Sequence, residues 1–144
     1  MNALLSIKPK YVEAIVSGKK RYEFRKSIFK NRAVERVYMY STAPVKKIVG
    51  SFRVGVIIED HPEQLWEQLK ELSGLNDIEF FSYFGDCEKG FAIRIESVDQ
   101  FQEPVDPNDL IIGFVPPQSF CYFDRIFAGQ VMTSKSEEQK KVIQ

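Results

Sequence analysis

Apolar residues recur with two different periods along the chain, and the period predicts the type of each element. Residues 2–7 form a short apolar run typical of a buried strand. Pro9 then begins a predicted helix, because apolar residues follow it at helical spacing until Gly18. Residues 20–26 alternate instead, which places Tyr22 and Phe24 on one side of a strand and charged residues on the other.

The remaining chain contains further alternating segments and two helical ones. Alternation predicts strands over residues 34–41, 47–59 and 91–98, and Gly50 and Gly55 predict a bulge or a bend in the second of these. Helices are expected over residues 62–72 and from Asn76 onward, where Asn76 is a suitable N-cap. The apolar segments 110–115 and 120–127 are predicted as the last strands.

This order of elements predicts an α+β protein built on a small, mostly antiparallel β-barrel. The first helix would lie beside the barrel, and the two later helices would form an insertion between strands. The 144 residues suit a single domain, which we assign to residues 1–128. Residues 129–144 are polar and are expected to form a C-terminal tail.

The net charge is zero, yet the charges are segregated along the sequence. Residues 1–53 hold 13 of the 20 basic residues and only three acids, whereas residues 54–144 hold seven bases and 17 acids. The first interpretation is a basic face that binds phosphate and an acidic face that does not. The second is that the two halves interleave in space and cancel.

Several classes of protein are excluded by what the sequence lacks. Cys87, Cys121 and His61 are widely spaced, which predicts neither a disulfide framework nor a zinc site. No phosphate-binding loop or dinucleotide motif is present, so no cofactor and no metal are expected. No apolar run approaches about 18 residues, which predicts no membrane contact and a cytoplasmic protein with reduced thiols.

The densest group of candidate residues lies along the strand at residues 20–26. Glu23 and Arg25 share one face, so the carboxylate can orient the guanidinium toward a phosphate or a base edge. Lys20 enters the strand and can turn to the same side, and Arg21 adds a further positive charge. The alternative interpretation is a solvated, charged strand with an incidental ion pair.

Other candidates are grouped at the first helix, at the turn after residue 41 and near residue 118. Lysines at a helix start and at a turn could extend a phosphate-binding patch, and the alternative is ordinary solubilising lysines. An amide, a hydroxyl and an aromatic ring after Pro116-Pro117 could contact a base, or the aromatic residues could simply enter the core. These candidates are Lys8, Lys10, Ser41, Lys46, Lys47, Gln118, Ser119 and Tyr122.

Three segments together resemble an ASCH domain of the PUA-like superfamily. They are LLSIKPKYVEAIVSGKKRYEFRK, then VYMYSTAPVKKIVGSFRVGVII, and later FVPPQSF. The resemblance covers about residues 3–127 and implies a β-barrel with a cleft beside the first helix. It also implies that the family's G-x-K-x-x-E-x-R signature lines this cleft, here through Gly18, Lys20, Glu23 and Arg25.

The resemblance implies two functions, and the composition of the insertion suggests a third. PUA-like domains typically bind RNA, which predicts an RNA-binding or nucleotide-binding protein with a role in transcription regulation or RNA metabolism and with single-stranded DNA as a further ligand. One ASCH branch hydrolyses N(4)-acetylcytidine with a Lys and a Thr. Lys20 matches that Lys, but Glu23 stands where the Thr would be, so Lys20 and Glu23 would form the reactive pair. The third hypothesis is that the acidic helices at residues 62–84 bind a protein partner.

Overall fold

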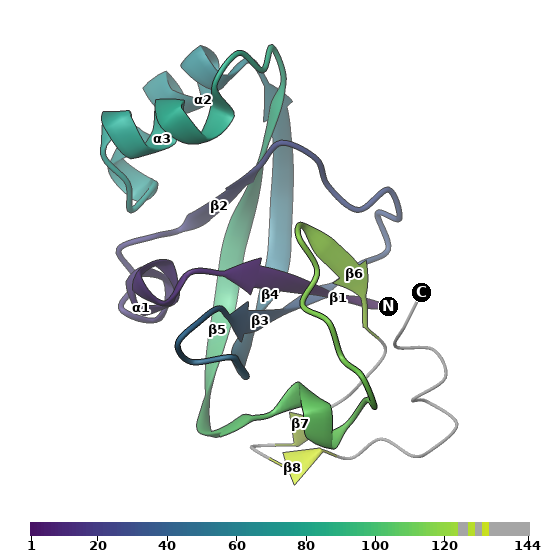
Figure 1. Cartoon of the computed structure of the whole chain (residues 1–144). Helices are drawn as coiled ribbons and strands as arrows, with labels where there is room; N and C mark the ends of the chain where they lie inside the picture. The colour runs from purple at the N-terminus through teal and green to yellow at the C-terminus, as the bar shows by residue number, and fades with distance from the viewer. Residues whose placement is uncertain (124–126, 129–130, 133–144) are drawn as a thin grey trace.

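One curled six-stranded sheet forms the body of the protein. A computed structural model describes residues 1–123, 127–128 and 131–132 (Figure 1). β1 and β3 run parallel, and every other neighbouring pair of strands in the sheet is antiparallel. The sheet curls into a partly closed barrel, which confirms the predicted mostly antiparallel α+β fold (Figure 1). In sheet order the strands are β2 (Tyr22–Arg25), β5 (Gly90–Val105), β4 (Lys47–Asp60), β3 (Arg36–Ser41), β1 (Asn2–Ile7) and β6 (Phe120–Tyr122).

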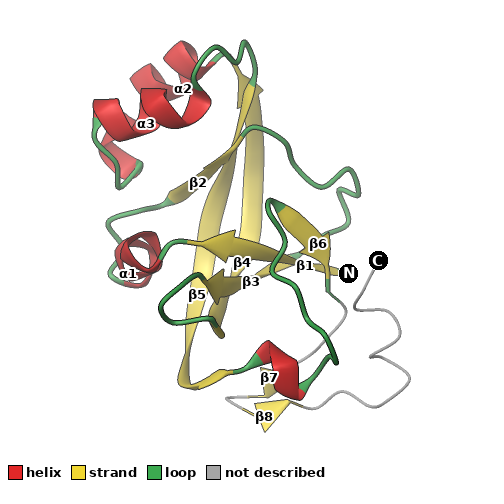
Figure 2. Ribbon diagram, in the orientation of Figure 1, coloured by secondary structure: helices red, strands yellow, loops and turns green. Residues whose placement is uncertain are grey.

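The helices occupy two places on the sheet. α1 (Pro9–Val16) follows β1 directly, whereas α2 (Pro62–Leu69) and α3 (Asp77–Phe84) sit together at one end of the long β4–β5 pair (Figure 2). Short 3-10 helices at Lys70–Leu72 and Pro107–Asp109 complete the helical elements of the described chain. Both insertion helices begin with side-chain caps. The imidazole Nδ1 of His61 accepts a hydrogen bond from the Glu63 backbone N–H, and Asn76 forms a capping box with Glu79.

Bulges in the β4–β5 ladder bend the two longest strands. The register shifts at three places, between Ile48 and Gly50, between Ser51 and Arg53, and between Val54 and Ile57. A Cβ atom at Gly50 would lie 2.5 Å from the carbonyl oxygen of Asp99, so only glycine allows β5 to approach this closely. These irregularities confirm the bend that the glycines predicted, and they let the sheet curl.

The buried apolar residues form three clusters. The first packs α1 against β1, β3, β4 and β5, and it includes Ile15, Met39 and Phe52. The second lies on the other face of β3, where Tyr38 and Tyr40 contact the region of Leu110. β3 therefore buries both faces. The third fixes the insertion to β2 and β5, with these residues at its centre: Tyr22, Phe24, Leu65, Leu69, Phe80, Phe84 and Ala92.

The C-terminal strands differ from the prediction. Residues 110–115 contain a turn at 110–113 and no strand: the backbone N–H groups of Leu110 and Ile111 both bond to the Pro107 carbonyl, and Gly113 adopts a φ of +71°. β6 covers only Phe120–Tyr122, and residues 124–126 lie outside the described part. Val131–Met132 pairs with Phe127–Ala128 as a small hairpin, although a polar tail was expected there; the rest of that tail lies outside the described residues.

No helix in the described part of the chain has the length and apolar character needed to cross a bilayer.

Candidate functional site

The charged side of β2 is buried. Lys20, Glu23 and Arg25 retain only 2%, 6% and 8% of their surface, so the interpretation as a solvated, charged strand is wrong. We call these three residues the buried charge cluster. β2 is an edge strand that pairs only with β5, yet the rest of the fold covers both of its faces. Charges at this depth require partners, because an unpaired buried ion is strongly unfavourable.

Arg25 connects the two edges of the curled sheet. Its Nε donates to Glu23 Oε2 at 3.0 Å, and its Nη2 lies 2.8 Å from the same oxygen. Nη2 also donates to the Ser6 carbonyl at 2.8 Å, and Nη1 donates to the Ser119 carbonyl at 3.3 Å. Ser6 belongs to β1 and Ser119 precedes β6, at the edge opposite β2. The guanidinium therefore bridges the open seam of the barrel, where no strand pairing is available.

Lys20 connects the cluster to the insertion. Its Nζ donates to the Ser73 carbonyl at 2.9 Å and lies 3.8 Å from Glu23 Oε1. It also lies 5.0 Å from the centroid of the Phe24 ring. Burial lowers the pKa of Lys20 below its usual 10.5; Glu23 opposes this shift and Arg25 adds to it. The amine therefore loses its proton more readily than an exposed lysine does.

Gly74 allows the chain to pass directly over Lys20. Its φ is +69°, and a Cβ atom placed on it would lie 2.6 Å from the Lys20 Cβ. A side chain at this position would collide with the lysine and strain the backbone. The loop between α2 and α3 thus fits against the cluster because it has a glycine there.

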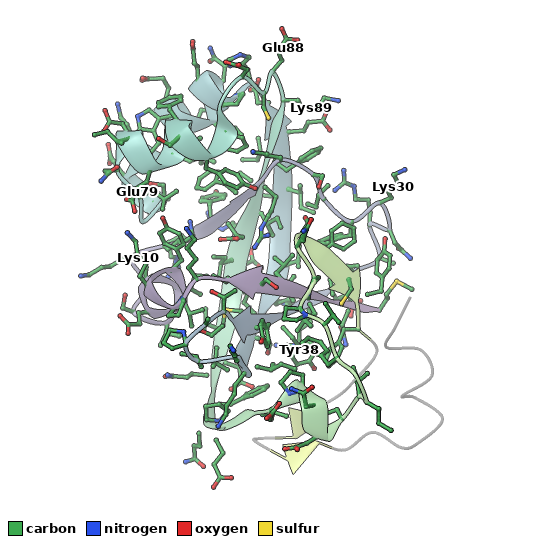
Figure 3. The ribbon with its side chains drawn as sticks, viewed as in Figure 1. Lys10, Lys30, Tyr38, Glu79, Glu88 and Lys89 are labelled. Carbon is green, nitrogen blue, oxygen red and sulfur yellow. The ribbon has the colours of Figure 1, made fainter. Side chains whose placement is uncertain are left out.

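Glu79 on α3 joins α1 across the entrance to the cluster. Its Oε2 lies 2.6 Å from the Lys10 Nζ and accepts a hydrogen bond of 3.0 Å from the Tyr11 hydroxyl. The hydrogen bond from Lys10, followed by those from the Asn76 backbone and from Tyr11, lowers the pKa of Glu79 from 4.5 to about 2. Figure 3 labels Lys10 and Glu79 on the neighbouring elements α1 and α3. A carboxylate of the acidic half therefore pairs with a lysine of the basic half.

A cavity of about 440 Å³ opens above the buried charge cluster, and we call it the Lys20 cavity. Strands β1 and β2, helices α1 and α3, and the loop before β6 all contribute to its wall. Lys8 stands at this cavity with an exposed side chain. The lining residues are Ser6, Ile7, Lys8, Tyr11, Lys20, Glu23, Phe24, Arg25, Thr42, Leu75, Glu79, Tyr83, Pro116, Pro117 and Gln118.

A larger hollow of about 640 Å³ lies elsewhere, beside β4. Its charged residues carry both signs, as in the pair Arg53 and Glu96, whose side chains are 60% and 41% exposed. None of its charged residues is buried, so ordinary solvation accounts for them. We therefore place the candidate site at the smaller Lys20 cavity, where the charges are buried.

Comparison with known proteins identifies the family. The profile of the ASCH domain matches residues 5–105. The chain belongs to the ASCH domain family. It is 29% identical over 126 residues to the ASCH domain-containing ribonuclease of Zymomonas mobilis subsp. mobilis, which covers 83% of this chain and 82% of that protein.

Solved ASCH structures share the fold of this chain. The crystal structure of ASCH from Zymomonas mobilis superposes with a TM-score of 0.80 at 27% identity, over 97% of this chain and 92% of that one. Crystal structures of a tyrosine-to-phenylalanine and a serine-to-alanine variant of the Zymomonas protein also give 0.80, each at 26% identity. They cover 97% of this chain and 94% and 92% of theirs.

The Lys20 cavity of this ASCH domain brings together only part of the predicted site. Lys8, Lys20, Glu23, Arg25 and Gln118 line it. Ser119 contributes its backbone carbonyl, which accepts a hydrogen bond from Arg25. Lys10 forms an ion pair with Glu79, which lines the cavity.

The other candidates lie outside the cavity of the ASCH domain. Arg21, Lys46 and Lys47 are exposed but do not line it, and Ser41 is buried at the end of β3. The Tyr122 hydroxyl accepts a hydrogen bond of 3.1 Å from the Asn31 N–H, and its ring packs 5.7 Å from the ring of Phe120. Tyr122 is partly buried and packs against the first apolar cluster.

Sequence reasoning missed the contribution of the insertion to the ASCH site. Glu79 and Tyr83 line the cavity from α3, while Ser73 and Gly74 contact Lys20 from the preceding loop. One signal was available, because positions 79 and 83 are four residues apart and share a helix face. The capping role of Glu79 gave no indication that its other oxygen faces α1.

The described part of the ASCH domain contains no group of three His, Cys, Asp or Glu side chains that could hold a metal ion. Cys87 and Cys121 are free thiols. Burial raises the pKa of Cys121 to about 11, so this thiol stays protonated at neutral pH and is a poor nucleophile.

Proposed function

We propose that this ASCH domain protein binds single-stranded RNA and takes one nucleotide of the strand into the Lys20 cavity. The observation that carries the proposal is the buried charge cluster, which opens into a cavity of about 440 Å³ beside Lys8. Small-molecule sites typically enclose about 300–1000 Å³, so the cavity suits one nucleotide and excludes a duplex. The similarity to a protein named a ribonuclease supports RNA as the partner.

The arrangement of donors and acceptors favours a base inside the cavity and a phosphate at its entrance. Lys20 supplies a donor, Glu23 an acceptor and Gln118 both, which matches the mixed edge of a base. A phosphate offers only acceptors and would be repelled by the Glu23 carboxylate. Arg25 already directs its donors to Glu23, Ser6 and Ser119, so its role here is to position the cluster.

Lys8 is the residue that we assign to the phosphate. Its ammonium makes no ion pair or hydrogen bond within the described residues. It also stands at the N-terminus of α1, where the helix dipole favours an anion. A strand bound in this way would have its base in the cavity and its backbone along α1.

We further propose that the protein acts in the cytoplasm, in the regulation of transcription or RNA metabolism.

The test is the salt dependence of binding to a short, fluorescently labelled single-stranded RNA. The logarithm of affinity should fall with the logarithm of salt concentration by about 0.7 for each phosphate neutralised. Lys8→Ala should weaken binding and reduce the magnitude of this slope by about 0.7, the value for one phosphate. Lys19→Ala is the matched control, because Lys19 is exposed and does not line the cavity.

Competition and the control variant decide the outcome. Single-stranded RNA should compete better than single-stranded DNA of the same sequence, and RNA duplex should compete least. A flat salt response, or equal effects of Lys8→Ala and Lys19→Ala, would contradict RNA binding at this cavity. Stronger competition by single-stranded DNA would assign the site to DNA.

A hydrolytic activity at the same cavity is the second candidate, and the environment of Lys20 favours it. Burial lowers the pKa of Lys20, which suits an amine that takes and returns a proton. A base bound inside the cavity would present its substituents to Lys20. In N(4)-acetylcytidine one of these substituents is an acetylated amine, so the amide bond would lie near Lys20. Lys20 would take a proton from water, the hydroxide would attack the acetyl carbonyl, and the C–N bond would break. The departing amine would take the proton from Lys20, giving cytidine and acetic acid, which then ionises to acetate.

Turnover assays distinguish this candidate from simple binding. Incubation with N(4)-acetylcytidine, followed by absorbance, reports amide hydrolysis; a labelled RNA on a gel reports strand cleavage. Strand cleavage would require the phosphodiester, rather than the base, to reach Lys20. Lys20→Met retains the length of the side chain and removes the amine, so it should abolish either activity. Turnover that persists in this variant would exclude Lys20 as the base.

A further inference from the structure

α3 presents three different faces to its surroundings. Phe80 and Phe84, four residues apart, are buried in the third apolar cluster. Ile78 and Phe81 are 73% and 37% exposed and do not line the Lys20 cavity. The third face, which carries Glu79 and Tyr83, lines the cavity. A helix of eight residues thus fixes the insertion with one face and directs another toward the candidate site.

Tyr83 is an aromatic residue held at the cavity wall without being buried there. Its side chain belongs to none of the three apolar clusters, and the residue is 41% exposed. The hydroxyl accepts a hydrogen bond of 3.1 Å from the Lys26 backbone N–H, and the ring meets Phe84 edge-on at 5.0 Å. The ring is therefore held at its hydroxyl and by its contact with Phe84, and it contributes to the cavity wall.

A positive charge lies over one face of this ring. The Nζ of Lys26 is 5.2 Å from the centroid of the Tyr83 ring. Lys26 directly follows β2, so it extends the signature strand outward from the buried charge cluster. Single-stranded nucleic acid sites combine an aromatic ring, on which a base stacks, with a cation that neutralises the adjoining phosphate. Tyr83 and Lys26 supply this pair.

The other aromatic residues at the site are less suited to stacking. Tyr11 is only partly exposed, and two ammonium groups, those of Lys10 and Lys20, lie 5.2 and 5.6 Å from its ring centroid. Phe24 is 5% exposed and packs against Phe80. Tyr122, for which stacking was predicted, lies outside the cavity. Tyr83 is thus the most exposed of the aromatic residues that line the Lys20 cavity.

We infer that Tyr83 is the platform on which a base of the bound strand stacks, and that Lys26 neutralises the phosphate next to that base. This inference rests on the proposed RNA binding and adds the helical insertion to the RNA interface. Because every base has a stacking face, the platform contributes affinity with little preference for sequence. The bound strand would extend from Lys8, across the cavity, to Tyr83.

The experiment measures the affinity of Tyr83 variants for the labelled single-stranded RNA. Tyr83→Ala should weaken binding by roughly fivefold to 150-fold, the range for loss of one base–aromatic stack. Tyr83→Phe retains the ring and should bind within about twofold of the unmodified protein. Phe81→Ala is the matched control, because Phe81 is a partly exposed aromatic on the same helix but outside the cavity. Lys26→Ala should reduce the salt slope by about 0.7.

A second measurement detects stacking directly and does not depend on the stability of the alanine variant. An RNA containing 2-aminopurine loses fluorescence when that base stacks, so the unmodified protein should quench it and Tyr83→Leu should quench it less. Equal affinities of Tyr83→Ala and Phe81→Ala, or equal weakening by Tyr83→Phe and Tyr83→Ala, would overturn the inference. If Lys8→Ala still weakens binding, the proposed function survives that result; an unmodified protein that binds no RNA would overturn both.

Discussion

Two groups of positive charge in this ASCH domain have opposite environments. Lys20 and Arg25 are almost completely buried, and their donors reach carbonyls in β1, in the loop before β6 and in the insertion. Lys46 and Lys47, at the turn between β3 and β4, are exposed and line no described cavity. The difference shows that charge density along a sequence does not locate a site. Burial against partners from distant segments does.

The sharpest test of this difference replaces one buried and one exposed cation by the same residue. Arg25→Met should lower the free energy of unfolding by about 3–5 kcal/mol, because it removes the guanidinium bonded to the buried Glu23 carboxylate, leaves only Lys20 beside it at 3.8 Å, and opens the seam. Lys47→Met should change it by less than about 0.5 kcal/mol. Urea denaturation monitored by the fluorescence of Trp66 measures both. Similar values for the two variants would contradict the structural role of Arg25.

A double variant separates the charge from the bridging contacts. Adding Glu23→Gln to Arg25→Met removes the carboxylate that has lost its guanidinium partner, so part of the lost stability should return. The remainder comprises the missing bonds to the carbonyls of Ser6 and Ser119 and the loss of the Glu23 charge beside Lys20.

The next largest effect should come from the loop that covers Lys20. Gly74→Ala should destabilise the protein by about 1–3 kcal/mol, because the new Cβ would lie 2.6 Å from that of Lys20. Gly85→Ala is the control: its φ is also positive, at +56°, but nothing lies within 4 Å of its Cβ position. Its cost should therefore be backbone strain alone, whereas Gly74→Ala adds a collision to the strain and should be the more destabilising. Thermal unfolding compares the two; equal destabilisation would show that the loop is free to move away from Lys20.

The smallest effect concerns the bond between α1 and α3, and it depends on pH. Because the pKa of Glu79 falls from 4.5 to about 2 on folding, its carboxylate stabilises the folded protein above pH 4.5. That contribution is lost as the pH falls from 4.5 toward 2. Glu79→Gln should therefore melt below the unmodified protein at pH 7, and the difference should shrink by pH 2.5. A difference independent of pH would indicate that the carboxylate charge has no role.

The basic and acidic residues that are segregated along the sequence come into contact in the folded protein. Lys10 pairs with Glu79, and Arg53 lies 3.9 Å from Glu96, so residues of the basic half meet residues of the acidic half. The halves thus interleave at these contacts. The cavity nevertheless retains Lys8, whose ammonium has no partner among the described residues.

Local patterns predicted most of the elements and failed where the chain forms turns. The helix starts at Pro9, Pro62 and Asp77 follow from proline at the first position and from the Asn76 cap. The alternation in β3 likewise indicates which residues share a face. Residues 110–115 were misassigned because apolar residues can anchor a turn as well as fill a strand, and the backbone bonds to Pro107 select the turn.

The sequence by itself determined the barrel, the two-helix insertion and the signature strand, because these depend on periodicity, capping and motifs within short windows. Only the tertiary structure decided that the charges of this strand are buried. Their partners are distant in sequence: Ser73 is 53 residues from Lys20, and Ser119 is 94 residues from Arg25. The cavity also depends on Glu79, which bonds to Tyr11 across 68 residues. Such contacts exist only once the sheet has curled, because its curvature brings the opposite edges within reach of one guanidinium.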